Sequence, residues 1–162
     1  MNMKALEHDS SEERYEIPIV VEPPDIDMLG HVNNIVYLRW VQEVAIAHWM
    51  ARATPDQQEK WHRVVVRHEI DYKRSARLGE KIVARTWVGQ ATDLTFERHT
   101  EILRAADRKL LARARTLWCP VNAQSGKPSR VDDDVRTRFS VPKDLVNTAG
   151  TQLSSHSILE KK

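Results

Sequence analysis

Two aspartates, a histidine and two asparagines stand close together near the start of the chain, in the stretch P-P-D-I-D-M-L-G-H-V-N-N. Asp25 and Asp27 supply carboxylates. Asn33 or Asn34 can cap a helix by accepting a hydrogen bond from a backbone N–H one turn further on. The N–H groups left free at a helix N-terminus can hold an oxyanion or a polarised carbonyl oxygen. A carboxylate across a small gap from such donors is suited to acyl transfer.

The same residues also have a purely structural interpretation. Aspartates form Asx-type turns and asparagines cap helices without doing any chemistry, and the spacing alone does not choose between the two interpretations. Gly30 lets the backbone turn sharply or approach a ligand closely. His31 shares the loop with Asp27, where it either contacts the substrate and orients the reacting groups or supports the loop.

A long helix is the element that must position this loop. From Ile35 onward the sequence is almost unbroken apolar and aromatic, and neither Gly nor Pro occurs until Pro55. This pattern predicts one long buried helix. From Asn34 to Arg52 it would span about 28 Å, the width of a small domain.

Strands account for most of the remaining chain. A period of two predicts strands at about 15–21, 64–72, 82–88, 94–102 and 110–119, and Pro18 indicates an edge or a bulge in the first. A helical turn from Thr54–Pro55 and a short helix at about 131–139 complete the elements. One strand, a long helix and a four-stranded meander predict an α+β fold, with the helix packed on an antiparallel sheet. The second strand is expected to place one set of side chains on a single face: Val64, Val66, His68, Ile70 and Tyr72.

The loop and helix together resemble a known family. The pattern D-x-D-x-x-G-H-V-N-N-x-x-Y-x-x-W, leading into a long helix, resembles the hot-dog fold acyl-CoA thioesterases of the 4-hydroxybenzoyl-CoA thioesterase type, over about residues 15–139. The resemblance implies a five-stranded antiparallel sheet wrapped around one long helix. It also implies that Asp27 is the catalytic carboxylate and that the thioester carbonyl is bonded to the backbone N–H of Asn34. The chain departs from some members at His31 and Asn33, where those carry apolar or aromatic residues.

The resemblance implies hydrolysis of an acyl-CoA thioester to free acid and coenzyme A. Asp27 then acts either as general base on water or as nucleophile through an anhydride, and Asn33 and Tyr37 are the expected substrate contacts. No metal or redox cofactor is implied, and coenzyme A enters only as part of the substrate. Two alternatives remain open, namely a hydratase or dehydratase of the same fold and a non-catalytic acyl-CoA-binding module. The hydratase is disfavoured because such relatives pair a histidine with an acid, whereas here the acid stands in the thioesterase position.

A homo-oligomer, either a homodimer or a homotetramer, is expected. A five-stranded sheet with one helix leaves an edge and one face poorly covered, and pairing removes that liability. In relatives of this type two subunits join their sheets and the sites lie between them. Thr92, Asp93 and Thr95 are the candidates for the partner's contribution. The coenzyme A phosphates are expected to meet arginines on strands and turns, and the sequence does not choose among Arg85, Arg113 and Arg115.

Length and composition bound the class of protein. The 162 residues predict a single domain at 14–143, flanked by extensions at 1–13 and 144–162 that carry no chemistry. Lys and Arg total 25 against 23 Asp and Glu, a formal charge of +2, and no basic cluster suggests nucleic acid. The single cysteine, Cys119, excludes an internal disulfide and fits a reducing compartment.

The sequence lacks the motifs of several other classes of protein. No apolar run has the length of a membrane span and the N-terminus does not have the character of a signal peptide, so we expect a cytoplasmic protein that binds no membrane. The seven histidines do not have metal-ligand spacing, which disfavours a metal site. Neither G-x-S-x-G nor a phosphate-binding glycine loop is present.

Overall fold

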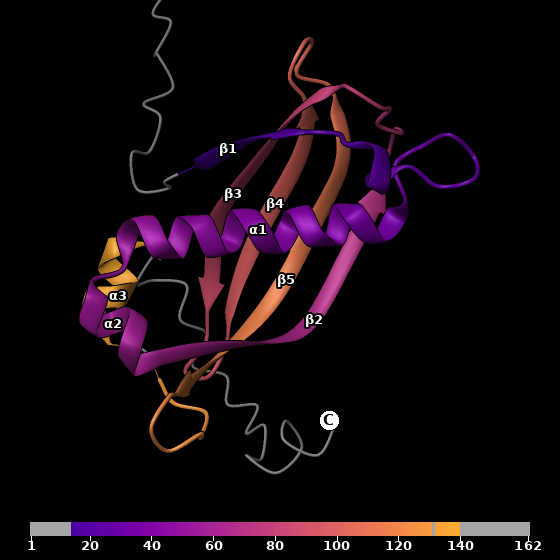
Figure 1. Ribbon diagram of the computed structural model, residues 1–162. Helices are drawn as coiled ribbons and strands as arrows, with labels where there is room; N and C mark the ends of the chain where they lie inside the picture. Colours follow the sequence, from indigo (N-terminus) through magenta and orange to yellow (C-terminus); the bar gives the residue numbers. More distant parts are fainter. Residues whose placement is uncertain (1–13, 131, 140–162) are drawn as a thin grey trace, which may run out of the picture.

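The computed structural model describes residues 14–130 and 132–139 (Figure 1). The predicted extensions at 1–13 and 144–162 lie outside these residues. In chain order the elements are β1 (Tyr15–Val20), the 3-10 turn η1 (Pro23–Asp25), α1 (Asn34–Arg52), α2 (Pro55–Lys60), β2 (Trp61–Tyr72), β3 (Lys81–Ala91), β4 (Phe96–Arg104), β5 (Leu110–Asn122) and α3 (Asp133–Arg138). The strands form one five-stranded antiparallel sheet in the order β1-β3-β4-β5-β2, and α1 lies across one face of it (Figure 1). This is the predicted α+β layout.

The helix α1 begins at a side-chain cap and buries one face. Asn33 is the N-cap, and its Oδ1 accepts a 3.0 Å hydrogen bond from the backbone N–H of Ile35. Trp40, near the middle of the helix, is completely buried against the sheet, whereas Ile35 and Met50 are exposed. The helix therefore contributes an apolar stripe to the core. The buried residues of that stripe are Val36, Tyr37, Trp40, Val41, Val44, Ala45, His48 and Trp49.

A β-bulge in β2 switches which side chains face the core. The register with β5 shifts by one between Val65 and Arg67, so Val66 is the extra residue. The prediction that Val64 and Val66 share a face with His68 is therefore wrong, because strict alternation does not continue through a bulge. Val64 and Val66 are instead 41% and 42% exposed. The more buried positions are Trp61, Arg63 and Val65 before the bulge and His68 and Ile70 after it.

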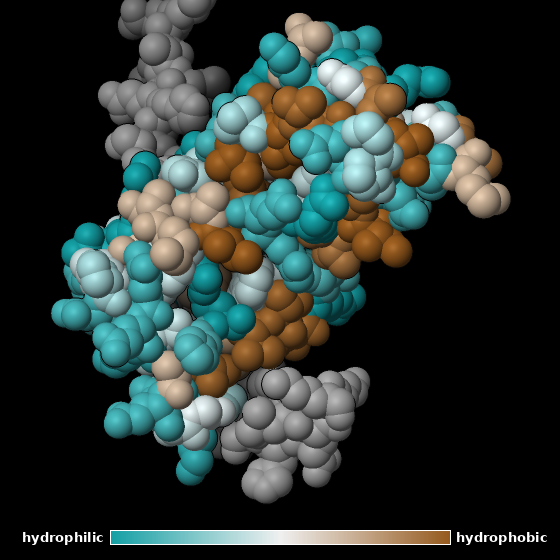
Figure 2. Space-filling model, viewed as in Figure 1, coloured by the Kyte–Doolittle hydropathy of each residue, from teal (hydrophilic) through white to brown (hydrophobic). Residues whose placement is uncertain are grey.

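The sheet ends in two different edge strands. β1 is one of them, and its Pro18 has no backbone N–H to donate. Of the two predicted alternatives, an edge or a bulge, the structure has the edge. β2 is the other, and within the described residues it pairs only with β5. Figure 2 shows apolar surface over β2 beside α1. None of the helices in the described residues combines the length and apolar character that crossing a bilayer requires.

Candidate functional site

A small hairpin carries Asp27. Ile26 and Val32 pair as an antiparallel bridge, and inside it the Asp27 N–H donates to the His31 carbonyl at 2.9 Å. The Gly30 N–H donates to the Asp27 carbonyl at 3.1 Å, and Gly30 has a φ of +77°. This left-handed conformation favours glycine and closes a three-residue hairpin loop, which explains the glycine of the motif. The local fold is therefore dictated by residues 26–32 themselves.

The two aspartates have different surroundings. Asp25 is 3% exposed, and both of its carboxylate oxygens are bound, one by Arg39 Nη2 at 2.7 Å and the other by the Glu22 N–H at 3.0 Å. Asp27 is partly exposed, and its Oδ1 accepts a 2.9 Å bond from the Leu29 N–H, which is an Asx turn. Its Oδ2 has no hydrogen-bond donor among the described residues. The turn-forming role of Asp27 therefore leaves one carboxylate oxygen for chemistry.

The start of α1 presents an unused backbone donor. Asn33 is occupied as the cap, and its carbonyl accepts the Val36 N–H at 2.9 Å. The N–H of Asn34, the first helical residue, has no acceptor among the described residues, as expected in the first turn of a helix. The Asn34 carbonyl accepts a 3.1 Å bond from the Tyr72 hydroxyl at the end of β2. The segment that carries Asp27 thus leads into a free N–H at the positive end of the helix dipole.

His31 and Tyr37 differ in how deeply they are buried. His31 is partly exposed, and its ring makes no hydrogen bond within residues 14–130 and 132–139. Tyr37 is 2% exposed, and its hydroxyl accepts the Ala76 N–H at 2.8 Å and donates to the Arg74 carbonyl at 3.4 Å. Burial raises the pKa of the Tyr37 hydroxyl. Tyr37 therefore supports the core beside the site, and a contact between Tyr37 and the substrate stays a prediction.

The turn from β3 to β4 lies at the other end of α1. Thr92 and Thr95 close this turn through a 2.8 Å contact between their hydroxyls, and Asp93 is exposed. Arg136 of α3 donates to the Thr92 carbonyl at 3.0 Å, and α3 packs at the Trp49 end of the helix. At about 1.5 Å per residue, Trp49 lies about 22 Å along α1 from Asn34. Within one chain, the structure does not bring Thr92, Asp93 and Thr95 together with Asp27.

The arginines suggested for coenzyme A already have carboxylate partners. Arg85 donates two hydrogen bonds to Glu101, and Arg113 also reaches Glu101, at 3.4 Å. Arg115 donates to Glu97 at 2.8 Å. These pairs form a ladder across β3, β4 and β5 on the face opposite α1. The uncovered sheet face is thus charged and suited to water, so the free edge of β2 is the stronger reason to expect pairing.

Sequence reasoning missed two supports of the site, Arg39 and Tyr72. Arg39 binds Asp25, and Tyr72 binds the carbonyl of Asn34. A basic residue in the second turn of the helix could have indicated the first contact, whereas no sequence signal points to the second. Within the described residues, no group of three His, Cys, Asp or Glu side chains gathers as metal ligands.

Comparison with known proteins assigns the chain to a family. Residues 21–139 match the thioesterase-like superfamily. The chain belongs to this superfamily. None of the curated proteins compared with the chain matches it. The predictions of a hot-dog fold and of a thioester hydrolase are confirmed at this level, and the 4-hydroxybenzoyl-CoA type stays a prediction.

Solved structures of thioesterases superpose on most of the chain. A 1,4-dihydroxy-2-naphthoyl-CoA thioesterase from Synechocystis is 21% identical, with 78% of this chain and 96% of that chain covered and a TM-score of 0.69. A thioesterase from Thermus thermophilus, in complex with coenzyme A and zinc, is 25% identical, with 77% and 96% covered and a TM-score of 0.69. A probable thioesterase from Escherichia coli is 20% identical, with 78% and 96% covered and a TM-score of 0.67.

Proposed function

We propose that this thioesterase-superfamily chain hydrolyses an acyl-CoA thioester to the free acid and coenzyme A. One observation carries the proposal: Asp27 keeps one unbound carboxylate oxygen in a hairpin that leads directly to the free N–H of Asn34. The coenzyme A bound to the Thermus thermophilus relative and the naphthoyl-CoA substrate of the Synechocystis relative favour a CoA ester. The cytoplasmic location stays a prediction.

The proposed reaction assigns one task to each group. A water molecule gives a proton to Asp27 while its oxygen bonds to the thioester carbonyl carbon. The carbonyl oxygen becomes an oxyanion, which the Asn34 N–H and the helix dipole stabilise. Collapse of this intermediate breaks the C–S bond, and the departing thiolate takes the proton from Asp27. In the alternative route an Asp27 oxygen bonds to the carbonyl carbon, the C–S bond breaks and coenzyme A leaves as its thiolate. Water then hydrolyses the resulting anhydride, which releases the free acid, restores the Asp27 carboxylate and supplies the proton for the thiolate.

We place the site between two copies of the chain. In one chain, apolar side chains stand exposed beside the hairpin and the helix N-terminus: Met28 at 101%, Leu29 at 80% and Ile35 at 74%. Antiparallel pairing of two β2 edges would set the Tyr72 end of one strand against the Trp61 end of the other. The turn with Thr92, Asp93 and Thr95 lies toward the Trp61 end, so the partner could bring it to the Asp27 hairpin.

Thiol release from a panel of acyl-CoAs of short, long and aromatic acyl groups tests the proposal. We expect release above the uncatalysed rate for at least one class, and its loss in Asp27→Asn with retention in Asp56→Asn. Asp56 is a suitable control because it is an exposed aspartate in α2. Cys119 will not interfere, because it is completely buried and burial raises the pKa of its thiol. An enoyl product would identify a hydratase instead, and acyl-CoA binding without release would identify a binding module.

A further inference from the structure

A cavity lies at the end of α1 that is remote from Asp27 in the same chain. Its walls come from the end of α1, the start of β2, the β3–β4 hairpin and α3, and they are mainly aromatic and aliphatic. Trp49 and Phe139 stack across one side with their ring centres 5.4 Å apart. About 450 Å³ in the cavity and its mouth is free of protein atoms, part of it open to solvent, and the centre of a water molecule can move through about 30 Å³. One water needs about 10–15 Å³ by this measure, so the enclosed part takes only a group the size of a carboxylate, and the body of a larger ligand would lie in the open mouth.

Three arginines line this apolar cavity: Arg63, Arg98 and Arg136. Arg98 is 2% exposed, and its Nη1 donates to His48 Nδ1 at 2.9 Å and to the Thr86 hydroxyl at 3.2 Å. Arg136 is 5% exposed and donates to a backbone carbonyl. None of these hydrogen-bond acceptors carries a negative charge.

The arginines also keep unused donors. The Nε atoms of Arg63 and Arg136 are buried and have no hydrogen-bond partner among the described residues. Arg63 lies over the Trp49 ring at 4.5 Å and near the Trp118 ring at 5.9 Å. Within residues 14–130 and 132–139, none of the three guanidinium groups makes an ion pair with a carboxylate. This differs from Arg85 and Arg115 on the outer face, which both do.

Burial of these charges is unfavourable because no carboxylate of the described residues pairs with them. Desolvation lowers the pKa of Arg63 to about 10, and desolvation together with the charge of Arg63 lowers the pKa of Arg98 to about 9. Desolvation and the charge of Arg130 lower the pKa of Arg136, and the charges of Asp93 and Asp133 oppose this only in part. An anion in the cavity would supply the missing charge partner.

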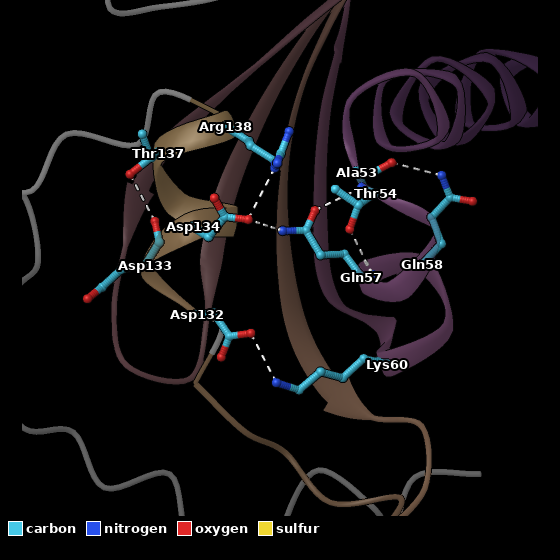
Figure 3. Close-up of polar contacts among 10 residues, drawn as sticks. All are labelled: Ala53, Thr54, Gln57, Gln58, Lys60, Asp132, Asp133, Asp134, Thr137 and Arg138. Atoms are coloured by element: carbon cyan, nitrogen blue, oxygen red, sulfur yellow. Dashed lines mark hydrogen bonds and ion pairs between the residues drawn. The ribbon is translucent and has the colours of Figure 1, made fainter.

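The wall that carries Arg136 is fixed by polar contacts between α3 and α2 (Figure 3). Gln57 Nε2 donates to Asp134 at 2.6 Å, and Lys60 Nζ lies 3.0 Å from Asp132. Arg138 donates to the same Asp134 carboxylate at 3.2 Å. These contacts occupy the carboxylates of Asp132 and Asp134 outside the cavity and hold α3, with Val135 and Arg136, against it.

We propose that this cavity binds the carboxylate group of a small organic acid, with the carboxylate toward Arg63, Arg98 and Arg136 and the apolar body against the aromatic walls. The guanidinium groups select a negative charge, and their planar forks match a carboxylate. The aromatic and aliphatic walls favour an apolar body over a strongly hydrated inorganic ion. Within one chain the cavity is remote from Asp27, and in the proposed dimer it lies behind the turn that would meet the partner's hairpin.

Calorimetric titration and thermal melting of the full chain with benzoate and butyrate test this site. The neutral amides benzamide and butyramide have matched shapes and no charge, and sodium chloride at equal ionic strength supplies an inorganic anion. We expect the carboxylates to bind and raise the melting temperature, and the amides and chloride to have little effect. Equal binding of the amides would show that charge is not recognised, and an equal effect of chloride would show an inorganic anion site. Either result, or no binding of any ligand, overturns the proposal.

Variants locate the binding. Arg63→Met removes one of the guanidinium groups that line the cavity and retains apolar bulk over Trp49, so we expect benzoate binding about 10- to 100-fold weaker. Arg98→Met tests the buried group in the same way, and Arg77→Met, at an exposed arginine elsewhere, should bind as the unmodified chain does. Benzoate also resembles a product of thioester hydrolysis, so binding is repeated with Asp27→Asn. Binding that is lost in Asp27→Asn and kept in Arg63→Met would place the ligand at the hairpin and overturn the proposal.

Discussion

The Asp25 carboxylate and the Arg39 guanidinium are joined by a 2.7 Å hydrogen bond that fastens the loop to the second turn of α1. The other Asp25 oxygen binds the Glu22 N–H, and the Asp25 carbonyl accepts the Asn33 N–H at 2.9 Å. Asp25 is thus fully occupied in holding the loop against the helix cap. Asp27 is placed by its own Asx turn and keeps one carboxylate oxygen free. Two aspartates of the same motif therefore have different tasks.

Asp25→Asn should lower stability and leave catalysis largely intact. The change weakens a charge-assisted bond to Arg39, which is half exposed, so we expect a loss of about 1–2 kcal/mol in the free energy of unfolding. For a chain of this length that is a fall of about 2–8 °C in melting temperature. Melting curves and thiol release well below the melting temperature measure the two effects. Near-complete loss of turnover in a folded Asp25→Asn protein would mean that Asp25, and not Asp27, is the reacting carboxylate.

Asp27→Asn should have the opposite effect. Asparagine keeps an acceptor oxygen for the Leu29 N–H, so the hairpin and the melting temperature should be retained. It removes the basic or nucleophilic oxygen, and general base catalysis contributes about 10²–10⁴-fold, so turnover should fall by at least about 10²-fold. Substrate affinity should change far less. Full activity in both aspartate variants would contradict the catalytic role assigned to this loop.

The parts that sequence could predict are those with local causes. An asparagine at a helix start and a proline in a strand each have a local backbone effect. The sequence predicted a cap at Asn33 or Asn34 and an edge or bulge at Pro18, and the structure has Asn33 as the cap and Pro18 in an edge strand. No local sequence feature indicates the bulge at Val66. The stretch W-H-R-V-V-V-R-H predicts a regular strand, and the register is set by pairing with β5. The D-x-D spacing likewise could not show that Asp25 would be buried. Its partner Arg39 lies on the helix, and the two side chains meet only because the chain turns between them.

The cavity lined by three arginines likewise could not be predicted from local sequence. Arg63, Arg98 and Arg136 come from three separate elements, β2, β4 and α3, and no motif spacing connects them. An arginine in an alternating strand is expected to be exposed. Arg98 is instead buried, because its position in β4 faces α1. Only the folded sheet brings the three charges to one place.

Val66→Lys should disrupt association if two copies pair through β2. Val66 is 42% exposed on the free edge strand, and a lysine there places like charges at a twofold interface and favours a solvated edge. Sedimentation should show about twice the 18.7 kDa chain mass for the unmodified protein and mainly monomer for the variant, with activity reduced accordingly.

Val20→Lys is the matched control for association, because Val20 is 54% exposed at the end of the other edge strand. It should leave the dimer intact. A fully active monomer of the unmodified chain would contradict the proposal that a partner completes the site. A Val66→Lys protein that remains dimeric would place the interface elsewhere.

His68 should make the fold sensitive to acid. Its Nδ1 lies 2.9 Å from the Thr116 hydroxyl, and burial lowers the pKa of His68 from its ordinary value of 6.5. Between the lowered folded-state pKa and 6.5 the unfolded chain binds more protons than the folded chain. Stability is therefore full above 6.5 and is lost as the pH falls through the folded-state pKa. Urea unfolding at pH values on both sides of this window should show a smaller loss in His68→Asn and an unchanged loss in the exposed His62→Asn. Equal acid sensitivity in His68→Asn and the unmodified chain would assign the effect to other groups.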